Sequence, residues 1–571
     1  MRKVCDDIQS STNHFSNVHS RRPSMKRRHH DNHDAALKGR LTYPANLVYP
    51  LDLARAFEAK RGAASTACSY EDHANQSPLT ETVQSADTST VILQAALPVF
   101  RLGYDRVLQY ITMFRNEVYP MYPCIGLEFA RNKIDALFAE PSPSSTGERQ
   151  ELDVDLIDIE ITKVVLAISM LIESDGHNPL SSDLEAHLIW NVDMKQEAVQ
   201  IEDIIMATLM TIYFILEDQP VKAWRMSGFG AKACLELGLH KESSLDTRDD
   251  SLADKAFLKD IFSCVYDLDK RSSFYTNLPW TLHEKDLDEN VFDLNGRHPY
   301  LSAMVRVNRL HSEIVELINS SPGLGTKEID ERAEFLGYRL QKLVEIIHES
   351  EMFPPESPEP LPPPATRTVM EAFVTLRTTH IRMLTHMRSL SSFETFSLRP
   401  QSVQILISLA ISSVDLHGKI VFAGGDEGAS RLLRTTIDKL LTVCVSCMFL
   451  AASYDPQVYG PICRNAFHTA INILSQAQSL PNEHSSKTML SSLADLRRMG
   501  ESIQMPALDR STLSTSAVGT DGSATQNHQV QPDFGEMDFS MLSETPNPEL
   551  FASMGDVDSN WEFEVEHLPF G

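Results

Sequence analysis

Apolar residues recur at intervals of three and four positions along residues 201–219, which read IEDIIMATLMTIYFILEDQ. This spacing places them on one broad face of a helix. A second helix is predicted over 220–239, because Pro220 suits a first helical position and Gly238 suits the left-handed residue that ends a helix. A third apolar stretch predicts a helix over roughly 252–273. Together these helices predict a compact helical unit at the centre of the chain.

The same periodicity continues on both sides of this unit. The third helix is followed by an extended exit over 278–291, and a short, uncertain element covers 183–190. Further helices are predicted at about 91–118, 127–139, 153–173, 299–319, 327–350, 366–390, 402–420, 429–453 and 459–478. The stretch 154–173 begins with alternating polarity, which is typical of a strand, but its length and its apolar second half favour a helix. No other stretch predicts a strand, so we expect an all-α, multi-helix bundle.

Composition divides the chain into four parts. Residues 1–90 are polar and basic with little periodicity, and we expect them to be disordered. The all-α domain should cover 91–480. It contains the proline-rich run 354–364, which must be extended and which reads as a linker rather than as a docking site for an adaptor domain. A polar linker over 481–530 and a disordered acidic, hydrophobic tail over 531–571 complete the chain.

Charge is distributed unevenly along the 571 residues. The formal net charge is −27, but residues 1–40 carry +5 and residues 511–571 carry −11, which leaves −21 for residues 41–510. A body that acidic repels the phosphate backbone of nucleic acids. We therefore expect any contact with nucleic acid to come from the basic N-terminal part or from a further segment.

The cysteines and the apolar runs indicate a soluble intracellular protein. Eight cysteines are scattered through the chain without a disulfide framework, which indicates a reducing compartment. The first 30 residues lack the apolar core of a secretory signal. The longest uncharged apolar runs, 204–216 and 440–454, fall short of the roughly 18–20 residues that span a bilayer. We expect no membrane association.

A compact basic cluster lies in the sequence RRPSMKRRHH at 21–30. Its members are Arg21, Arg22, Lys26, Arg27 and Arg28. Such a cluster on a flexible segment can bind the acidic groove of an import receptor, which predicts nuclear localisation. The alternative is a solvated basic tail without a partner.

The C-terminal tail mixes acids with large apolar side chains and contains no base. The candidate contact residues are Phe534, Met537, Phe539, Leu542, Leu550, Phe551, Trp561 and Phe563. Like charges keep such a chain expanded, so its apolar side chains can enter grooves on coactivators as short induced helices. The alternative is a solubilising acidic tail, although such tails rarely hold so many large apolar residues.

The sequence offers only weak signals for a catalytic, metal-binding or phosphate-binding site. Cys444 and Cys447 form a lone CxxC in an apolar helix, where buried small side chains are the better interpretation. His240 at a helix end is expected to cap or pack the helix. For His283, next to Glu284 and Asp286, a charged loop position is the better interpretation and an acid/base pair is the alternative. The glycine-rich run 422–430 lacks the lysine and the strand of a phosphate loop and reads as a helix–helix turn.

The central unit resembles the middle homology region of fungal zinc-cluster transcription factors, also called the fungal-specific transcription factor domain. The matching residues are Trp224, Arg225, Gly238, Leu239, His240, Tyr266, Asp269, Lys270, Pro279, Asp286 and Asp288. They follow the family's order of an Ala-rich helix ending in Gly-Leu-His, a helix with Tyr, Asp and Lys, and an acidic exit. Ser263 replaces the family's usual Trp, and Asn277-Leu278 replaces its Gly-Arg. The resemblance covers roughly 102–319.

This resemblance implies a transcriptional regulator rather than an enzyme. It implies an RNA polymerase II activator with a helical regulatory domain that restrains or displays the tail, in response to a small effector or a partner. The family binds DNA, typically as dimers, through six cysteines that hold two zinc ions. Only Cys5 and Cys68 lie in the first 90 residues, so we expect no cofactor and no direct DNA binding without a partner factor or an upstream zinc module. A helical scaffold or corepressor, and then an all-α enzyme, are the alternatives.

Overall fold

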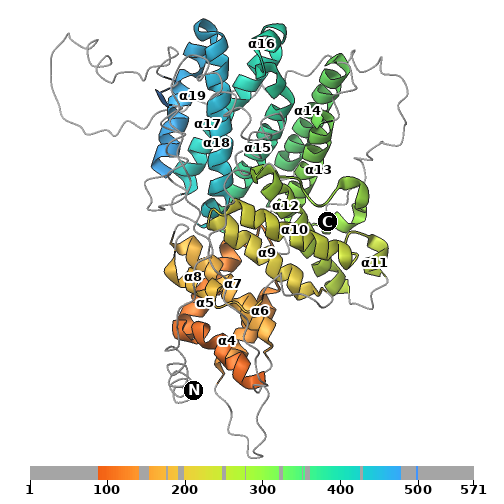
Figure 1. The fold of residues 1–571 in the computed structure, drawn as a ribbon, viewed down its shortest axis with the longest axis vertical. Helices are drawn as coiled ribbons and strands as arrows, with labels where there is room; N and C mark the ends of the chain where they lie inside the picture. The colour runs from red at the N-terminus through yellow and green to blue at the C-terminus, as the bar shows by residue number, and fades with distance from the viewer. Residues whose placement is uncertain are drawn as a thin grey trace, which may run out of the picture. The chain divides into compact units, whose positions relative to one another are not determined.

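The described part of the protein consists of helices joined by turns and short extended segments. The computed structural model describes residues 88–139, 154–174, 178–190, 199–246, 252–276, 278–319, 326–349, 352–353, 361–424 and 428–477, together with 497, 498 and 500. Over these residues it contains sixteen α-helices and no strand, which confirms the predicted all-α class. All of them belong to one unit, residues 1–507. Figure 1 shows the helices, labelled from α4 onwards.

Three helices form the central unit that the apolar pattern predicted. They are α9 (Ile201–Leu216), α10 (Pro220–Glu236) and α12 (Leu252–Thr276), and each packs against the other two (Figure 1). Pro220 occupies the first turn of α10. Gly238 follows the helix end with a φ of 74°, a left-handed conformation that costs a glycine little.

The connections of this unit differ from the prediction in two places. A short helix that the pattern did not predict, α11 (Glu242–Asp246), lies between α10 and α12. The exit from α12 is extended but contains two short 3-10 helices, η2 (Glu284–Asp286) and η3 (Glu289–Phe292). Backbone hydrogen bonds from Leu287 to Glu284 and from Asp293 to Asn290 close these turns.

The N-terminal helices precede this unit. They are α4 (Thr88–Leu102), α5 (Tyr104–Glu117), α6 (Leu127–Phe138), α7 (Leu156–Glu173) and α8 (Pro179–Ala186). The single helix predicted over 91–118 is wrong, because Gly103 adopts a φ of 80° and separates α4 from α5. The stretch 154–173 is a helix rather than a strand, and a capping box between Asp155 and Asp158 fixes its start.

The remaining helices follow the central unit. They are α13 (Pro299–Asn319), α14 (Thr326–Glu349), α15 (Pro364–His386), α16 (Phe393–Leu398), α17 (Pro400–Gly424), α18 (Gly428–Tyr454) and α19 (Pro456–Ala477), with a short 3-10 helix, η5 (Met387–Leu390), after α15. Helix α16 was not predicted. Helix α15 packs against α13, α17 and α18, and this part connects to the central unit through α13 on α12 and α18 on α9. Pro364 begins α15 instead of ending the proline-rich loop.

One segment of α18, which extends the uncharged run 440–454 toward its N-terminus, has the length and apolar composition of a membrane span. Leu432–Tyr454 meets this criterion, and 82% of it is buried inside the protein. It packs against α15, α17 and α19. Because the core helix of a soluble protein meets the same criterion, the segment is weak evidence for a membrane.

Several predictions fall outside the described residues. They concern the basic cluster at 21–30, the proline run 354–360, most of the linker 481–530 and the acidic tail 531–571. Those assignments stay predictions.

Within the described part, the largest fully buried side chains include the polar residues Arg377, Tyr122, Tyr266 and Lys270, which belong to the network described next.

Candidate functional site

Helix α12 carries a run of buried charged residues. Residues 261–274 are all buried, so α12 is surrounded by other elements over most of its length. This stretch contains four charged residues, Asp267, Asp269, Lys270 and Arg271. Because nearby positions on a helix point in different directions, these side chains face different neighbours. Burying a charge is costly unless it is paired and hydrogen-bonded, so the partners of each residue are informative.

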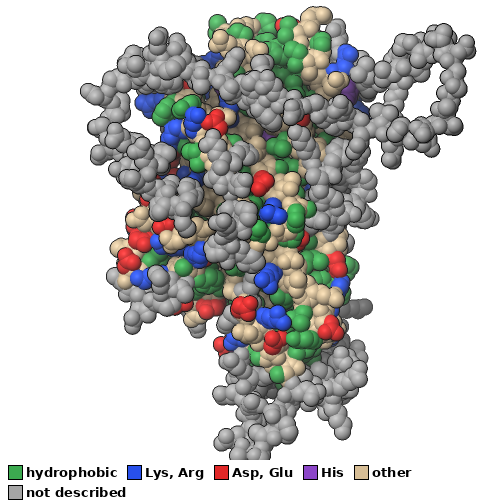
Figure 2. Space-filling model, turned by 180° about the vertical axis from the view of Figure 1, so that it is seen from behind, with side chains coloured by type: hydrophobic (Ala, Val, Ile, Leu, Met, Phe, Trp, Pro, Cys, Tyr) green, Lys and Arg blue, Asp and Glu red, His purple; other side chains and the backbone are tan. Residues whose placement is uncertain are grey.

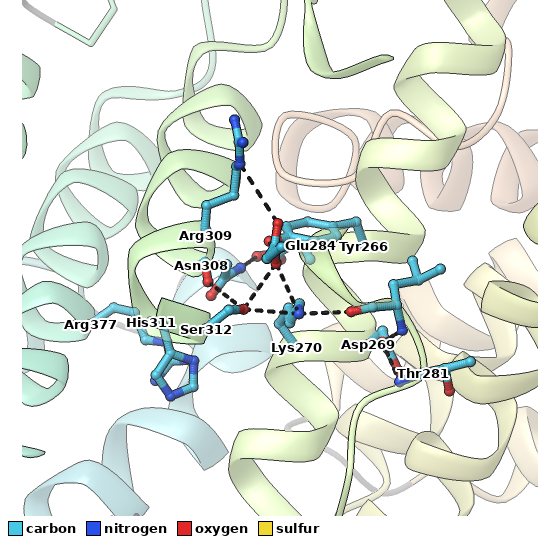
Figure 3. A network of polar contacts seen from close by, with 12 residues as sticks. Tyr266, Asp269, Lys270, Thr281, Glu284, Asn308, Arg309, His311, Ser312 and Arg377 are labelled. Carbon is cyan, nitrogen blue, oxygen red and sulfur yellow. Dashed lines mark hydrogen bonds and ion pairs between the residues drawn. The ribbon is translucent and has the colours of Figure 1, made fainter. Parts of the chain in front are cut away.

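Lys270 is the most highly connected of these residues. Its ammonium group donates to the carbonyl oxygen of Leu282 at 2.9 Å and to Ser312 Oγ at 2.9 Å, and it lies 3.1 Å from Glu284 Oε1. Tyr266 also donates to Glu284 Oε1, at 2.6 Å. Figure 3 shows these side chains pointing toward one another. Burial lowers the pKa of Lys270, and Glu284 opposes that shift and favours the charged form.

Asp269 fixes the extended exit segment against α12. Its Oδ2 accepts the backbone N–H groups of Thr281 at 2.8 Å and of Leu282 at 2.9 Å (Figure 3). Burial raises the pKa of Asp269 to about 6, although both hydrogen bonds act in the opposite direction. Trp224 of α10 donates its indole N–H to the carbonyl oxygen of Pro279 at 2.8 Å. The exit segment is therefore bound to both α10 and α12.

Asp267 and Arg271 connect α12 to parts of the chain that are distant in sequence. Asp267 accepts from Tyr122 at 2.8 Å and from the side-chain amide of Asn308 at 2.7 Å. Arg271 donates to Tyr122 at 3.0 Å and to the carbonyl oxygen of Leu432 at 2.7 Å. The network thus joins the segment after α5, helix α13 and the start of α18 to α12.

Arg377 of α15 extends the buried network. Its guanidinium carbon lies 3.6 Å from the centre of the Phe274 ring, and its Nη2 lies 3.4 Å from His311 Nδ1. Burial lowers the pKa of Arg377 to about 9, and Asp267 opposes this shift. Burial also lowers the pKa of His311, reinforced by the charge of Arg377, so this ring is neutral at pH 7.

The acidic end of the motif closes onto the turn after α10. The backbone N–H of Asp288 donates to the carbonyl oxygen of His240 at 3.0 Å. The carboxylate of Asp288 accepts from the backbone N–H of Glu242 at 3.0 Å and lies 3.4 Å from Lys241 Nζ. Burial lowers the pKa of His240, with Lys241 as a smaller cause, so a packing role fits this residue better than a cationic cap.

The motif residues separate into two groups. The first group makes the contacts described above or packs around them: Leu239 is buried, Gly238 ends α10, and the bonded members are Trp224, His240, Tyr266, Asp269, Lys270, Pro279 and Asp288. Arg225 and Asp286 are exposed and take no part in these contacts. The structure therefore brings most of the predicted set together around α12 and leaves these two at the surface.

The structure also places the cysteine pair and the histidine that the sequence singled out. Cys444 and Cys447 are fully buried in α18, and burial raises the pKa of the Cys444 thiol to about 12, as expected for unreactive core side chains. The less favoured alternative, an acid/base pair of His283 with Glu284, has no support in the described residues. His283 is exposed, whereas Glu284 turns toward Lys270 because the buried ammonium requires a counter-charge.

Sequence reasoning missed several members of the network. They are Asp267, Arg271, Asn308, His311 and Arg377, and Glu284 was considered only as a neighbour of His283. The run DLDKR at 267–271 carries a usable signal, because four charges directly after the largely apolar stretch 261–266 must find buried partners. Across the described ranges, no group of three or more His, Cys, Asp or Glu side chains could hold a metal ion. The arrangement fixes segments of the chain relative to one another.

Comparison of the chain with protein-family profiles, with curated proteins and with solved structures finds no match. The family resemblance therefore rests on the ordered residues themselves and stays a hypothesis. On the face shown in Figure 2, the Lys and Arg side chains of the described part are interspersed with Asp and Glu and form no continuous basic area.

Proposed function

We propose that this protein is a transcriptional regulator of the fungal zinc-cluster type, in which the helical body is a regulatory domain. One observation carries the proposal. Motif residues tie the acidic exit to α10 and α12: Trp224 bonds to Pro279, Asp269 holds the backbone of 281–282, and Asp288 bonds to the turn after α10, as expected if the motif is one structural unit rather than a chance set of short matches. The network holds the chain in place, which fits a control module.

The two ends of the chain supply the rest of the proposal. The basic cluster at 21–30 binds an import receptor and directs the protein to the nucleus. The apolar and acidic residues of 531–571 bind a coactivator, which makes the protein an activator of RNA polymerase II transcription. Contact with DNA comes through a partner factor or through a zinc module upstream of the sequence.

A reporter assay tests the activator function. Residues 511–571 are fused to an unrelated DNA-binding module, beside a matched variant in which Phe534, Met537, Phe539, Leu542, Leu550, Phe551, Trp561 and Phe563 are replaced by serine. The wild-type fusion should activate the reporter. The serine variant should be inactive, because it keeps every acid and loses the apolar side chains that enter a coactivator groove.

A helical scaffold or corepressor is the second candidate. The charge of −21 over residues 41–510 and the presence of only two cysteines in the first 90 residues favour it, since neither supports direct DNA binding. Under this function the wild-type tail fusion is silent. A fusion that activates equally with and without the apolar side chains contradicts the proposed coactivator contact as well.

A further inference from the structure

A small cavity lies where the turn between α9 and α10 meets α12 and α18. It has a volume of about 20 Å³. Asp218, Arg271, Ser272, Tyr275 and Thr436 form the polar part of its wall, and the rest of the wall is apolar. These polar groups come from three separate elements, so the cavity marks a junction between the central unit and α18.

Most polar groups of the wall already have partners. Tyr275 donates to Asp218 Oδ1 at 2.9 Å, and Arg271 Nε donates to Thr436 Oγ1 at 3.2 Å. The Ser272 hydroxyl has no hydrogen-bond partner among the described residues, although Ser272 is only 3% exposed. A buried hydroxyl without a partner costs about 1–3 kcal/mol, so this position calls for a polar occupant.

The volume limits what that occupant can be. A water molecule needs at least about 10–15 Å³ and two to four polar partners, whereas sites for small organic ligands occupy roughly 300–1,000 Å³. We propose that the cavity is a binding site for one structural water molecule, which pairs with Ser272 Oγ and bridges it to Asp218 and Thr436. Asp218 and Thr436 each keep hydrogen-bonding capacity beyond the bonds described above.

The bound water completes the contact between α12 and α18. Arg271 and Thr436 join these helices directly, and the water adds a link from Ser272 to α18 and to the turn after α9. This role goes beyond the proposed regulatory function, because it concerns how the central unit is attached to the helices that follow it. It also means that the cavity is too small for an effector molecule.

Two neighbouring serines of α12 provide a matched test in the full-length protein. Ser273 is also 3% exposed and its hydroxyl also has no partner among the described residues, but it does not line the cavity. Ser272→Ala removes a partner of the bound water and should lower the thermal unfolding midpoint by roughly 1–3 °C. Ser273→Ala removes only an unpaired hydroxyl and should leave the midpoint unchanged or raise it. Equal effects of the two variants overturn the proposal.

A cavity-filling variant and a crystal structure give independent readouts. Ala223 lines the cavity and is 1% exposed, so Ala223→Val adds two methyl groups to this space. If water occupies the cavity, the variant displaces it and lowers the midpoint, whereas filling a dry cavity raises it. Electron density for one ordered molecule within hydrogen-bond distance of Ser272 Oγ supports the proposal. An empty cavity or a larger occupant overturns it.

Discussion

Lys270 illustrates how a buried charge is tolerated at the level of a single residue. Its side chain is fully buried, yet two oxygen acceptors and the Glu284 carboxylate surround the ammonium group. The Trp280 ring adds a further favourable contact, with its centre 4.3 Å from Nζ. Such a pair contributes little net stability but is expensive to break on one side, because Glu284, only 19% exposed, then keeps among the described residues only the longer ion pair of 3.7 Å with Arg309 Nε.

Removing the Lys270 charge should therefore destabilise the protein strongly. Lys270→Met keeps the apolar stem and leaves Glu284 without its main counter-charge. We expect the free energy of unfolding in urea to fall by about 3 kcal/mol. Lys342→Met is the matched control, because Lys342 pairs with Glu345 at 2.6 Å on the exposed surface of α14 and should cost less than about 1 kcal/mol. Equal losses in the two variants would contradict the assigned role of Lys270.

His380 predicts a pH dependence of stability. Its two ring nitrogens lie 2.7 Å from the carbonyl oxygen of Leu376 and 3.0 Å from that of Leu440, which joins α15 to α18. Burial lowers its pKa to about 4, against 6.5 when exposed, although both carbonyls oppose the shift. Between these values the unfolded chain binds more protons than the folded protein. Stability should thus fall as the pH drops from 6.5 to 4, by on the order of 3 kcal/mol from this residue.

Unfolding measurements across this pH range test the prediction with a variant. In wild type, His380 contributes to the slope of the free energy of unfolding against pH between pH 6.5 and 4. In His380→Gln this contribution should disappear, even if the variant is less stable at every pH. Asp269 acts in the opposite direction, because its raised pKa makes the folded protein bind more protons between pH 3.8 and 6. The informative quantity is therefore the difference in slope between wild type and variant. An unchanged slope would exclude His380 as a buried neutral group.

The role of Gly238 in ending helix α10 can be tested by substitution. It terminates α10 with a φ of 74°, and a Cβ atom at this position would lie 3.0 Å from Ser244 Oγ. Gly238→Ala should cost about 1–2 kcal/mol through the left-handed backbone and this close contact. Gly337→Ala is the control, because Gly337 lies within α14 with open space around it and should gain roughly 0.5–1 kcal/mol. If the urea midpoints of both variants move in the same direction, the helix-ending role assigned to Gly238 is wrong.

The helices whose apolar face repeats over several turns were predictable from the sequence. α9 and α13 begin at their predicted first residues. A long periodic apolar stripe marks both helices, an acidic first turn marks the start of α9, and a proline marks the start of α13. The break at Gly103 was missed, since the apolar stripe continues through it. The short helices α11 and α16 were missed because five or six residues cannot show a helical period.

The site was predictable only in part, for a physical reason. The motif residues could be listed from their order, but their partners could not. Tyr122 and Asp267 are 145 positions apart, and Arg271 and Leu432 are 161 apart. No local pattern encodes such pairs, because they depend on how whole helices pack. The DLDKR run indicates that buried partners exist, and only the fold identifies them.

At the scale of the whole molecule, the separation of charge along the chain is the dominant feature. The body carries −21, while residues 1–40 carry +5 and residues 511–571 carry −11. An acidic body does not compete for the acidic groove of an import receptor. The proposed nuclear localisation therefore depends on the compact basic cluster at 21–30 rather than on total charge.

A comparison of two sets of basic residues distinguishes clustered charge from total charge. Replacing Arg21, Arg22, Lys26, Arg27 and Arg28 with alanine in a full-length fluorescent fusion should abolish its nuclear enrichment under the microscope, because a receptor groove needs several adjacent cations at once. Replacing Arg2, Lys3, Lys38 and Arg40 removes nearly the same charge from outside the cluster and should leave the fusion nuclear. If both variants lose enrichment equally, net charge is the determinant. If neither does, the import signal lies elsewhere in the chain or the fusion enters the nucleus with a partner.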